Sequence, residues 1–371
     1  MNRLEPYCAP PALQLSMVCG RWREIVASRS SMWSALRIAF VFWEEKFSNL
    51  ANLVDTFVER SGSQPLDLEF VFAGTTDGME RGISSIMRIL AQNSVGTISP
   101  ALYGLFKDSP SLHTLRIDGS TLNNGHFDLP SDSIKVVQIW GGPTPDVLGF
   151  VSSFTHLEDL RLLHLRGSND HDTLPRTLSS TVRSATLSWD TEEDADTSLR
   201  YFALPGLKFL TLSGDRKSWT SWANSITTKS SFLTRSACSL TSLSLNRLPI
   251  SHQQTIALLE LVPTLTTLEI EERRLDAPNQ IVTGSFLRRF TVCHQLEVLQ
   301  SGHIFLPRLM DATFVMRRNG LIEEDLFDAI SSRWIPEPKE ASEVGVACLR
   351  SVQITVMEKS ARECRLRSWS A

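Results

Sequence analysis

Apolar residues recur along this chain in a six-residue phrase, with apolar side chains at its first, fourth and sixth positions and mostly polar ones between. Seven phrases follow one another at intervals of 22, 23, 25, 25, 33 and 25 residues, and another begins at Leu349. Because alternate side chains of a strand point to opposite faces, each phrase predicts a strand with one buried face. The apolar residues of the phrases are Leu112, Leu115, Ile117; Ile134, Val137, Ile139; Leu157, Leu160, Leu162; Val182, Ala185, Leu187; Leu207, Leu210, Leu212; Leu240, Leu243, Leu245; Leu265, Leu268, Ile270; and Leu349, Val352, Ile354.

The spacing of the phrases predicts a repeat architecture. Most intervals fall in the range of about 20–29 residues that is typical of leucine-rich repeats. One unit of this size cannot bury its own apolar face, but stacked units bury a common one. Between phrases, a segment such as 254–261 has the apolar spacing of a helix, and Pro263 would end it. We therefore expect an α/β leucine-rich-repeat solenoid, in which helices cover the convex side of a curved parallel sheet.

The repeats are irregular, which limits what the pattern predicts about their boundaries. Regular repeats often have Asn at the third position after the phrase, and these asparagines form a continuous row along the solenoid. Such a row cannot form here, because other residues occupy that position. Degraded phrases at Leu287, Phe290, Val292 and at Leu309, Ala312, Phe314 leave the boundaries between residues 271 and 348 open. The positions that would carry the asparagine hold Ser120, Leu165, Asp190, Asp215, Leu248 and Arg273.

A different pattern precedes the phrases. Leu15, Val18, Trp22 and Ile25 have the spacing i, i+3, i+7 and i+10, which predicts one continuous helix with Trp22 as its anchor. A second element is expected over residues 31–38, after serines that can cap or turn the chain. A helix that covers the open end of the solenoid would account for this pattern without any further function.

The residues of the N-terminal segment also resemble a known family. Val18-Cys19-x-x-Trp22-x-x-Ile25, followed by Trp33-x-x-Leu36, resembles the C-terminal half of an F-box. The resemblance covers most of the chain and implies a partial F-box-like helical segment at 1–45 and an irregular leucine-rich-repeat domain at 46–371. Segments similar to the F-box leucine-rich-repeat proteins expanded in mushroom-forming fungi are 59–68, 236–245 with 248–250, and 265–270.

The resemblance implies a substrate-recognition subunit of a Skp-cullin-F-box E3 ubiquitin ligase. In such a subunit the F-box binds the Skp-type adaptor of the cullin ligase core, and the repeats bind a protein substrate, here of unknown identity. The resemblance places Trp22 and Trp33 in the F-box core, with Ile25 in the same motif. It makes Leu15, Val18 and Leu36 candidates for contact with the adaptor.

The resemblance leaves two functions open. An F-box begins with a helix of the Leu-Pro-x-Glu type, whereas residues 1–14 carry Leu4-Glu5-Pro6. We expect either a truncated N-terminus or a copy that has lost the adaptor-binding half of its F-box. The alternative to a ligase subunit is an adaptor-independent leucine-rich-repeat binding module, or a decayed F-box paralogue without ligase association.

Strand geometry selects candidates for partner binding on the concave face. The residue between the last two apolar positions of a phrase, and the residue two before it, point away from the core. Arginine and aromatic residues often carry binding energy, so Arg116, Arg161 and Phe209 are the expected hot spots. For any one of them, a merely solvated surface position explains the pattern equally well. The full set of candidates is Arg116, Gln138, Asp159, Arg161, Phe209 and Glu269.

Composition and motifs narrow the function classes further. A net charge of −4 and dispersed basic residues disfavour nucleic-acid binding. The six cysteines are scattered, which favours reduced thiols, and no apolar run is long enough to span a membrane. We therefore expect a cytoplasmic or nuclear protein.

The motifs of the chain also bear on catalysis and on cofactor or metal binding. The chain carries no nucleophile elbow, phosphate-binding loop, zinc motif or dinucleotide motif, so no catalytic residue, metal or cofactor is expected. The acidic run Asp190 to Asp196 lacks the central glycine of a calcium loop, and we expect a solvated loop there.

Overall fold

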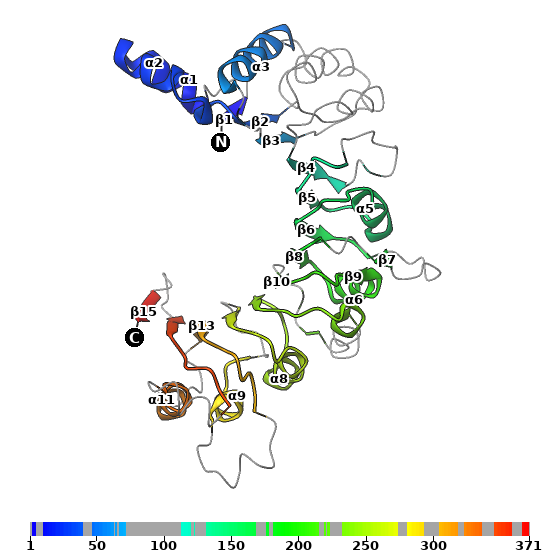
Figure 1. Ribbon diagram of the computed structural model, residues 1–371, viewed down its shortest axis with the longest axis vertical. Coiled ribbons are helices and arrows are strands. Elements are labelled where there is room, and N and C mark those ends of the chain that lie inside the picture. Colours follow the sequence, from blue (N-terminus) through cyan, green and yellow to red (C-terminus); the bar gives the residue numbers. More distant parts are fainter. Residues whose placement is uncertain are drawn as a thin grey trace. The chain divides into compact units, whose positions relative to one another are not determined.

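The computed structural model of the chain describes the following ranges: residues 2–4, 10–39, 47–62, 64, 67–71, 113–119, 122, 131–167, 176–177, 181–214, 219, 221–222, 232–273, 280–292, 304–317, 323–335, 345–357 and 366–370. Its contacts divide the chain into two compact units, residues 1–161 and 162–371 (Figure 1). The division falls within strand β6 (Asp159–Leu165).

The first unit combines short parallel strands with helices. β1 pairs with β2, β2 with β3, β3 with β4 and β4 with β5, all in parallel. Leu115 and Ile117, and Ile134, Val137 and Ile139, are buried as their phrases predict, whereas Leu112 lies outside the described residues. The elements are β1 (Asn2–Leu4), α1 (Pro11–Val18), α2 (Gly20–Ala27), the 3-10 helix η1 (Ser30–Met32), β2 (Ala35–Ala39), α3 (Phe47–Ser61), β3 (Asp67–Val71), β4 (Thr114–Asp118), β5 (Val136–Trp140) and α5 (Thr144–Val151).

Trp33 is the centre of the packing at the start of the first unit. Its ring is fully buried and contacts Phe57 of α3 edge-on, with 4.9 Å between ring centroids. Arg60 lies over the same ring, and the indole N–H donates to the carbonyl of Val26 in α2 at 2.8 Å. These contacts join residues on both sides of the predicted boundary between residues 45 and 46. The N-terminal helices therefore share a core with α3.

The predicted continuous helix through Leu15 and Ile25 is wrong. Cys19 is extended, with φ −161° and ψ 172°, and it separates α1 from α2. The Arg23 side chain donates to the carbonyl of Ser16 at 3.1 Å, which satisfies an acceptor in the last turn of α1. The break means that residues 15 and 18 do not share one helix face with residues 22 and 25. The second predicted element is η1 followed by β2.

The second unit is a parallel sheet with helices along one side (Figure 1). Its strands run in the order β8, β10, β11, β12, β13, β14, all parallel, and β15 pairs with β14 in antiparallel fashion. Helices α6, α8, α9 and α11 lie on the same side of these strands. The elements are β7 (Arg176–Thr177), β8 (Ser184–Trp189), α6 (Glu192–Tyr201), β9 (Phe202–Ala203), β10 (Phe209–Gly214), β11 (Ser242–Asn246), α8 (His252–Glu260), β12 (Thr267–Glu271), α9 (Gly284–Phe290), β13 (Asp311–Arg317), α11 (Glu323–Ser331), β14 (Ser351–Met357) and β15 (Leu366–Ser370).

The apolar phrases stack in register across this sheet. Leu210 lies opposite Ala185 on one side and Leu243 on the other, and Leu243 lies opposite Leu268. Every phrase residue of the second unit is buried, and the most exposed of them, Ile354, is only 8% exposed. The predicted strands and their inward faces are confirmed here. The helix expected over 254–261 is confirmed as α8, which begins at a capping box between Ser251 and Gln254.

The sequence left the repeat boundaries between residues 271 and 348 open. Of the two degraded phrases in this range, one forms a strand and the other does not. The phrase at Leu309 is confirmed, because Ala312 and Phe314 of β13 lie in register with β12 and β14. The degraded phrase at Leu287 is wrong: Leu287 and Phe290 lie in α9. Thr283 caps that helix by accepting from the Phe286 N–H, and a spacing of three residues suits a helix as well as a phrase.

A buried arginine holds the C-terminal part of the second unit together. Arg333 is fully buried and donates to the carbonyls of Phe290, Leu306 and Phe305. Its guanidinium also lies over the Phe290 ring, 4.3 Å from the centroid. Burial lowers the pKa of the Arg333 guanidinium to about 10, so the group remains charged at neutral pH. One charged side chain thus satisfies carbonyls from separate segments behind the sheet.

No helix of the described ranges is long and apolar enough to cross a lipid bilayer.

Arg333→Met is expected to destabilise the protein by about 3 kcal/mol, because it leaves buried carbonyls without their donors. The measurement is the midpoint of urea unfolding. Arg308→Met is the matched control, since Arg308 is exposed, and its effect should stay within about 0.5 kcal/mol. Equal effects of the two substitutions would contradict the role assigned to Arg333.

Candidate functional site

The predicted F-box residues separate into a buried and an exposed group. Trp33 and Leu36 are buried, as expected for a core. Trp22 is 45% exposed, so its assignment to the core is wrong. The reason is the extended residue Cys19, which turns α2 so that Val26 enters the core instead.

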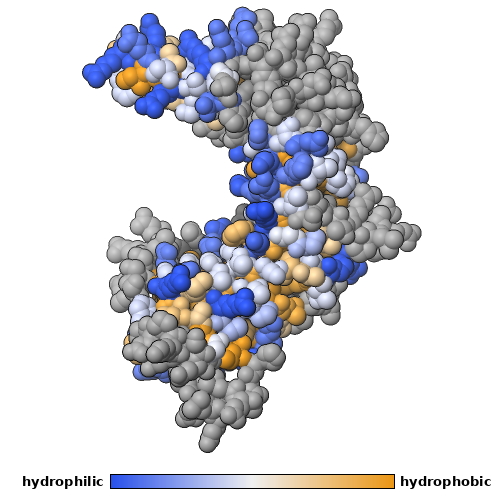
Figure 2. All heavy atoms as spheres, in the orientation of Figure 1, coloured by the Kyte–Doolittle hydropathy of each residue, from blue (hydrophilic) through white to orange (hydrophobic). Residues whose placement is uncertain are grey.

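The exposed group consists of large apolar residues on α1 and α2. Val18 is 64% exposed, Ile25 is 42% exposed, and Met17 is also exposed, while Leu15 is half-buried. Figure 2 shows hydrophobic side chains between hydrophilic ones on this helical pair. Large apolar side chains that gather on one surface indicate a contact site, whereas single ones are common on any protein. We call Met17, Val18, Trp22 and Ile25 the α1–α2 surface.

The concave-face candidates of the first unit are largely engaged with their neighbours. Arg161 donates to Asp159 through Nε at 3.0 Å and Nη2 at 2.7 Å. Arg116 and Gln138 are half-buried and lie in register on β4 and β5. The pattern predicted the accessible side of these strands correctly, but it did not predict that Arg161 and Asp159 pair with each other.

In the second unit, Phe209 stands out among small side chains. It is 51% exposed at the start of β10, and it lies in register with Ser184 of β8 and Ser242 of β11. Glu269 is exposed on β12 and accepts from Ser244 at 3.0 Å. The predicted exposure of Phe209 and Glu269 is therefore confirmed. A large, half-exposed aromatic ring between serines is available for contact with a partner.

A pocket lies at the other end of the same strands. Ser188 and Ser213 are small and in register, and longer side chains flank them on neighbouring strands, which leaves a pocket of about 310 Å³. It collects residues from the C-terminal ends of β6, β8, β10, β11 and β12. Its lining is Leu163, His164, Ser188, Ser213, Gly214, Asn246, Arg247 and Glu271.

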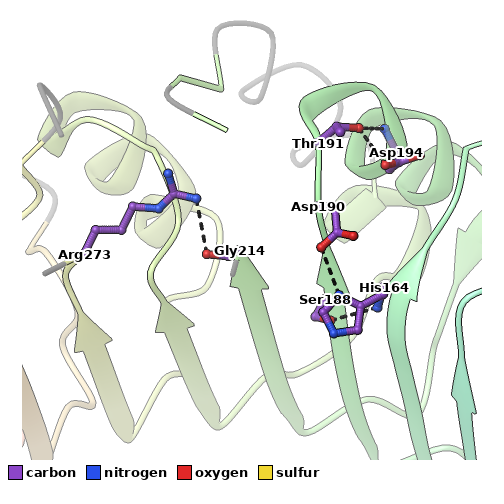
Figure 3. Close-up of polar contacts among 7 residues, drawn as sticks. All are labelled: His164, Ser188, Asp190, Thr191, Asp194, Gly214 and Arg273. Carbon is purple, nitrogen blue, oxygen red and sulfur yellow. Dashed lines mark hydrogen bonds and ion pairs between the residues drawn. The ribbon is translucent and has the colours of Figure 1, made fainter. Parts of the chain in front are cut away.

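His164 forms one wall of the pocket. It has a left-handed backbone, with φ +54°, and its main-chain N–H donates to Ser188 Oγ at 3.0 Å. Its Nδ1 lies 2.9 Å from Asp190 Oδ1, as Figure 3 shows. The Ser188 hydroxyl thus accepts from the main chain of His164, and the His164 imidazole contacts the Asp190 carboxylate. These bonds hold the end of β6 against the loop that follows β8.

Arg247 forms the opposite wall in a similar way. It too is left-handed, with φ +54°, and its N–H donates to the carbonyl of Glu271 at 2.7 Å. Its Nε donates to the Glu271 carboxylate at 2.8 Å. Arg273 reaches back across these strands and donates to the carbonyls of Arg247 and Trp219. It also donates to the carbonyl of Gly214, as Figure 3 shows. Each wall therefore combines a left-handed residue with bonds that hold it in place.

The acidic run beside the pocket is not the predicted solvated loop. Glu192 begins α6, whose N-cap Thr191 accepts from the Asp194 N–H. Asp194 accepts from the Gly167 N–H at 2.6 Å, and Asp196 is buried and accepts from the Trp222 indole at 2.7 Å. Acidic side chains suit the first turn of a helix because they interact favourably with its dipole. Within the described ranges, no three His, Cys, Asp or Glu side chains converge as a metal site would require.

Sequence reasoning missed the pocket, although one signal for it was present. Asp190 and Arg273 are two of the residues at the position where regular repeats carry asparagine. That position lies just beyond the strand, where side chains hold the turning backbone. His164 and Arg247 gave no signal, because nothing in an isolated sequence predicts a left-handed histidine or arginine.

Gly214→Ala is expected to destabilise the protein by about 1–3 kcal/mol. An added Cβ would lie 2.9 Å from the Trp219 ring and 3.3 Å from the Arg247 carbonyl. The measurements are thermal unfolding and tryptophan fluorescence, which should report the displaced ring. Gly20→Ala is the control, since a Cβ there meets nothing within 4 Å in helix α2, and stability should be unchanged or raised. A Gly214→Ala protein as stable as the control would contradict this account of the packing at Gly214.

The sequence was also compared with known proteins. Comparison with models of known protein families finds no family that matches this chain, and comparison with curated proteins finds no match either.

Proposed function

We propose that this chain is the substrate-recognition subunit of a Skp-cullin-F-box E3 ubiquitin ligase and binds its protein substrate through leucine-rich repeats. The in-register phrases of the second unit support the repeat assignment. Parallel strands bury the same three apolar positions of each phrase, and the helices lie on one side. This is the arrangement expected of a leucine-rich-repeat solenoid, whose open strand face is a surface for binding proteins.

The observation that carries the ligase assignment is the α1–α2 surface. Met17, Val18, Trp22 and Ile25 are exposed beside a buried Trp33. Val18, Trp22 and Ile25 are residues of the motif that resembles an F-box, and a helical adaptor would cover them on binding. The described part of the fold does not bury these apolar side chains, and contact with an adaptor would explain why they are present.

An adaptor-independent binding module is the second candidate. The break at Cys19 favours it, because the motif residues then lie on two short helices instead of one. Both candidates assign protein binding to the strand face and neither assigns chemistry to the chain. Both also place it in the cytoplasm or nucleus, with a protein partner and without nucleic acid or membrane.

Trp22→Ala is expected to reduce co-purification of the cognate Skp adaptor by at least about tenfold, because large aromatic side chains commonly dominate such contacts. Since Trp22 is already exposed, unfolding stability should change little. Trp334→Ala is the matched control, because Trp334 has the same 45% exposure but lies in the second unit.

Three outcomes separate the candidates. Adaptor binding that Trp22→Ala weakens and Trp334→Ala does not would support the ligase subunit. Binding that neither substitution changes would contradict the role of the α1–α2 surface. If neither this chain nor a version extended upstream of Met1 binds the adaptor, the adaptor-independent module is the better assignment.

A further inference from the structure

We propose that the strand face around Phe209 docks an acidic segment of the protein substrate, in which carboxylates flank a leucine or another large apolar residue. This inference rests on the proposed function and adds the chemistry of the bound segment. The surface, called here the Phe209 patch, consists of Arg183, Ser184, Thr186, Lys208, Phe209, Thr211, Thr241, Ser242 and Ser244 on β8, β10 and β11 and at the points where they begin.

Hydrogen bonding fixes these residues in three cross-strand rows. The N–H groups of Lys208 and Phe209 donate to the Arg183 carbonyl, and those of Thr241 and Ser242 donate to the Lys208 carbonyl. The next row holds Ser184, Phe209 and Ser242, and the third holds Thr186, Thr211 and Ser244. The two basic residues are thus neighbours at the points where adjacent strands begin, and Lys208 directly precedes Phe209 in the sequence. Main-chain hydrogen bonds at the starts of the strands set their spacing.

The two charged residues of the patch are both basic. Arg183 and Lys208 are both exposed, and neither has an ion pair with any described residue. None of the nine residues of the patch carries a carboxylate, although the chain as a whole has a net charge of −4. Glu269 on β12 is an acidic residue on the same face as the patch, and it accepts from Ser244. A partner segment with carboxylates complements this surface, and a basic segment is repelled.

Phe209 supplies the apolar part of the contact. Half of its surface is exposed, and the serines in register with it leave the sides of the ring accessible. A leucine or an aromatic residue of the partner can pack on this ring and remove it from water. The hydroxyls of Thr186, Thr211, Ser184 and Ser242 can bond the main chain of the segment. The carboxylates of the partner segment can then pair with Arg183 and Lys208, because these long side chains can adjust to their positions.

Single-stranded nucleic acid is the other class of anion that stacks on aromatic rings and pairs with cations. Two cations provide few phosphate contacts, and the chain as a whole has a net charge of −4, which disfavours a polyanion. The observations therefore favour a peptide segment. A labelled single-stranded oligonucleotide serves as a test of the alternative.

The experiment selects peptides from a randomised display library on the full chain, and then measures enriched peptides by fluorescence anisotropy. Enrichment of acidic residues around a leucine or aromatic residue is the expected result. Phe209→Ala and the double charge reversal Arg183→Glu with Lys208→Glu should each weaken binding by at least about tenfold. Binding should also weaken as salt is raised, because the charges are exposed.

Arg350→Glu is the matched control for the charge reversal. Arg350 is exposed and lies in the continuation of the same cross-strand row, before β14, but several strands away from β10. It should leave peptide binding within about twofold. The double reversal should also bind peptides whose acidic residues are replaced by lysine better than the original protein does. A damaged fold cannot produce that gain.

Selection of basic or uncharged peptides, no selection at all, or acidic binding that survives the double reversal would each overturn the inference. Saturable binding of the oligonucleotide that the double reversal abolishes would overturn it in favour of nucleic acid. The adaptor experiment depends on the α1–α2 surface in the first unit, so it reports on the proposed function independently of these outcomes.

Discussion

The register of the apolar phrases is the constraint on which the second unit depends. Three inward side chains per strand are too few for a core, so each strand needs the same three positions on its neighbours. A shift of one residue would turn every leucine of a strand to the open face. Leu212, for example, is buried only because Leu187 and Leu245 lie beside it in register. The outward positions carry no such requirement, and they are free to differ from strand to strand.

The same constraint explains what the sequence could and could not predict. Apolar residues with a period of two predicted β8, β10, β11 and β12, because burial demands that pattern. The pattern was ambiguous at Leu287 and Phe290, since a spacing of three residues suits a helix as well as a phrase. The N-cap at Thr283 favours the helix, and these residues lie in α9. Apart from Asp190 and Arg273 just beyond the strands, the sequence carried no signal of the pocket. The pocket depends on the small size of Ser188 and Ser213 relative to their neighbours and on the left-handed His164 and Arg247.

The two tryptophans of the N-terminal motif show a similar limit. Both Trp22 and Trp33 fit the motif, and both would serve as a core residue. Trp33 is buried because Val26, Phe57 and Arg60 surround it. Trp22 is exposed because Cys19 ends the first helix before it. Spacing alone predicted a shared helix face, whereas one extended residue decided which tryptophan belongs to the interior.

The two ends of the strands in the second unit differ in how they use charge. At the C-terminal ends, polar and charged side chains are bonded within the chain: His164 to Asp190, Arg247 to Glu271, and Arg273 to main-chain carbonyls. These bonds hold loops and left-handed turns, so removing them to bind a partner would cost stability. At the N-terminal ends of β8 and β10, Arg183 and Lys208 have no ion pair among the described residues and support no turn. Charge that the fold does not use is free to select a partner, which is why the substrate segment is assigned to this end of the sheet.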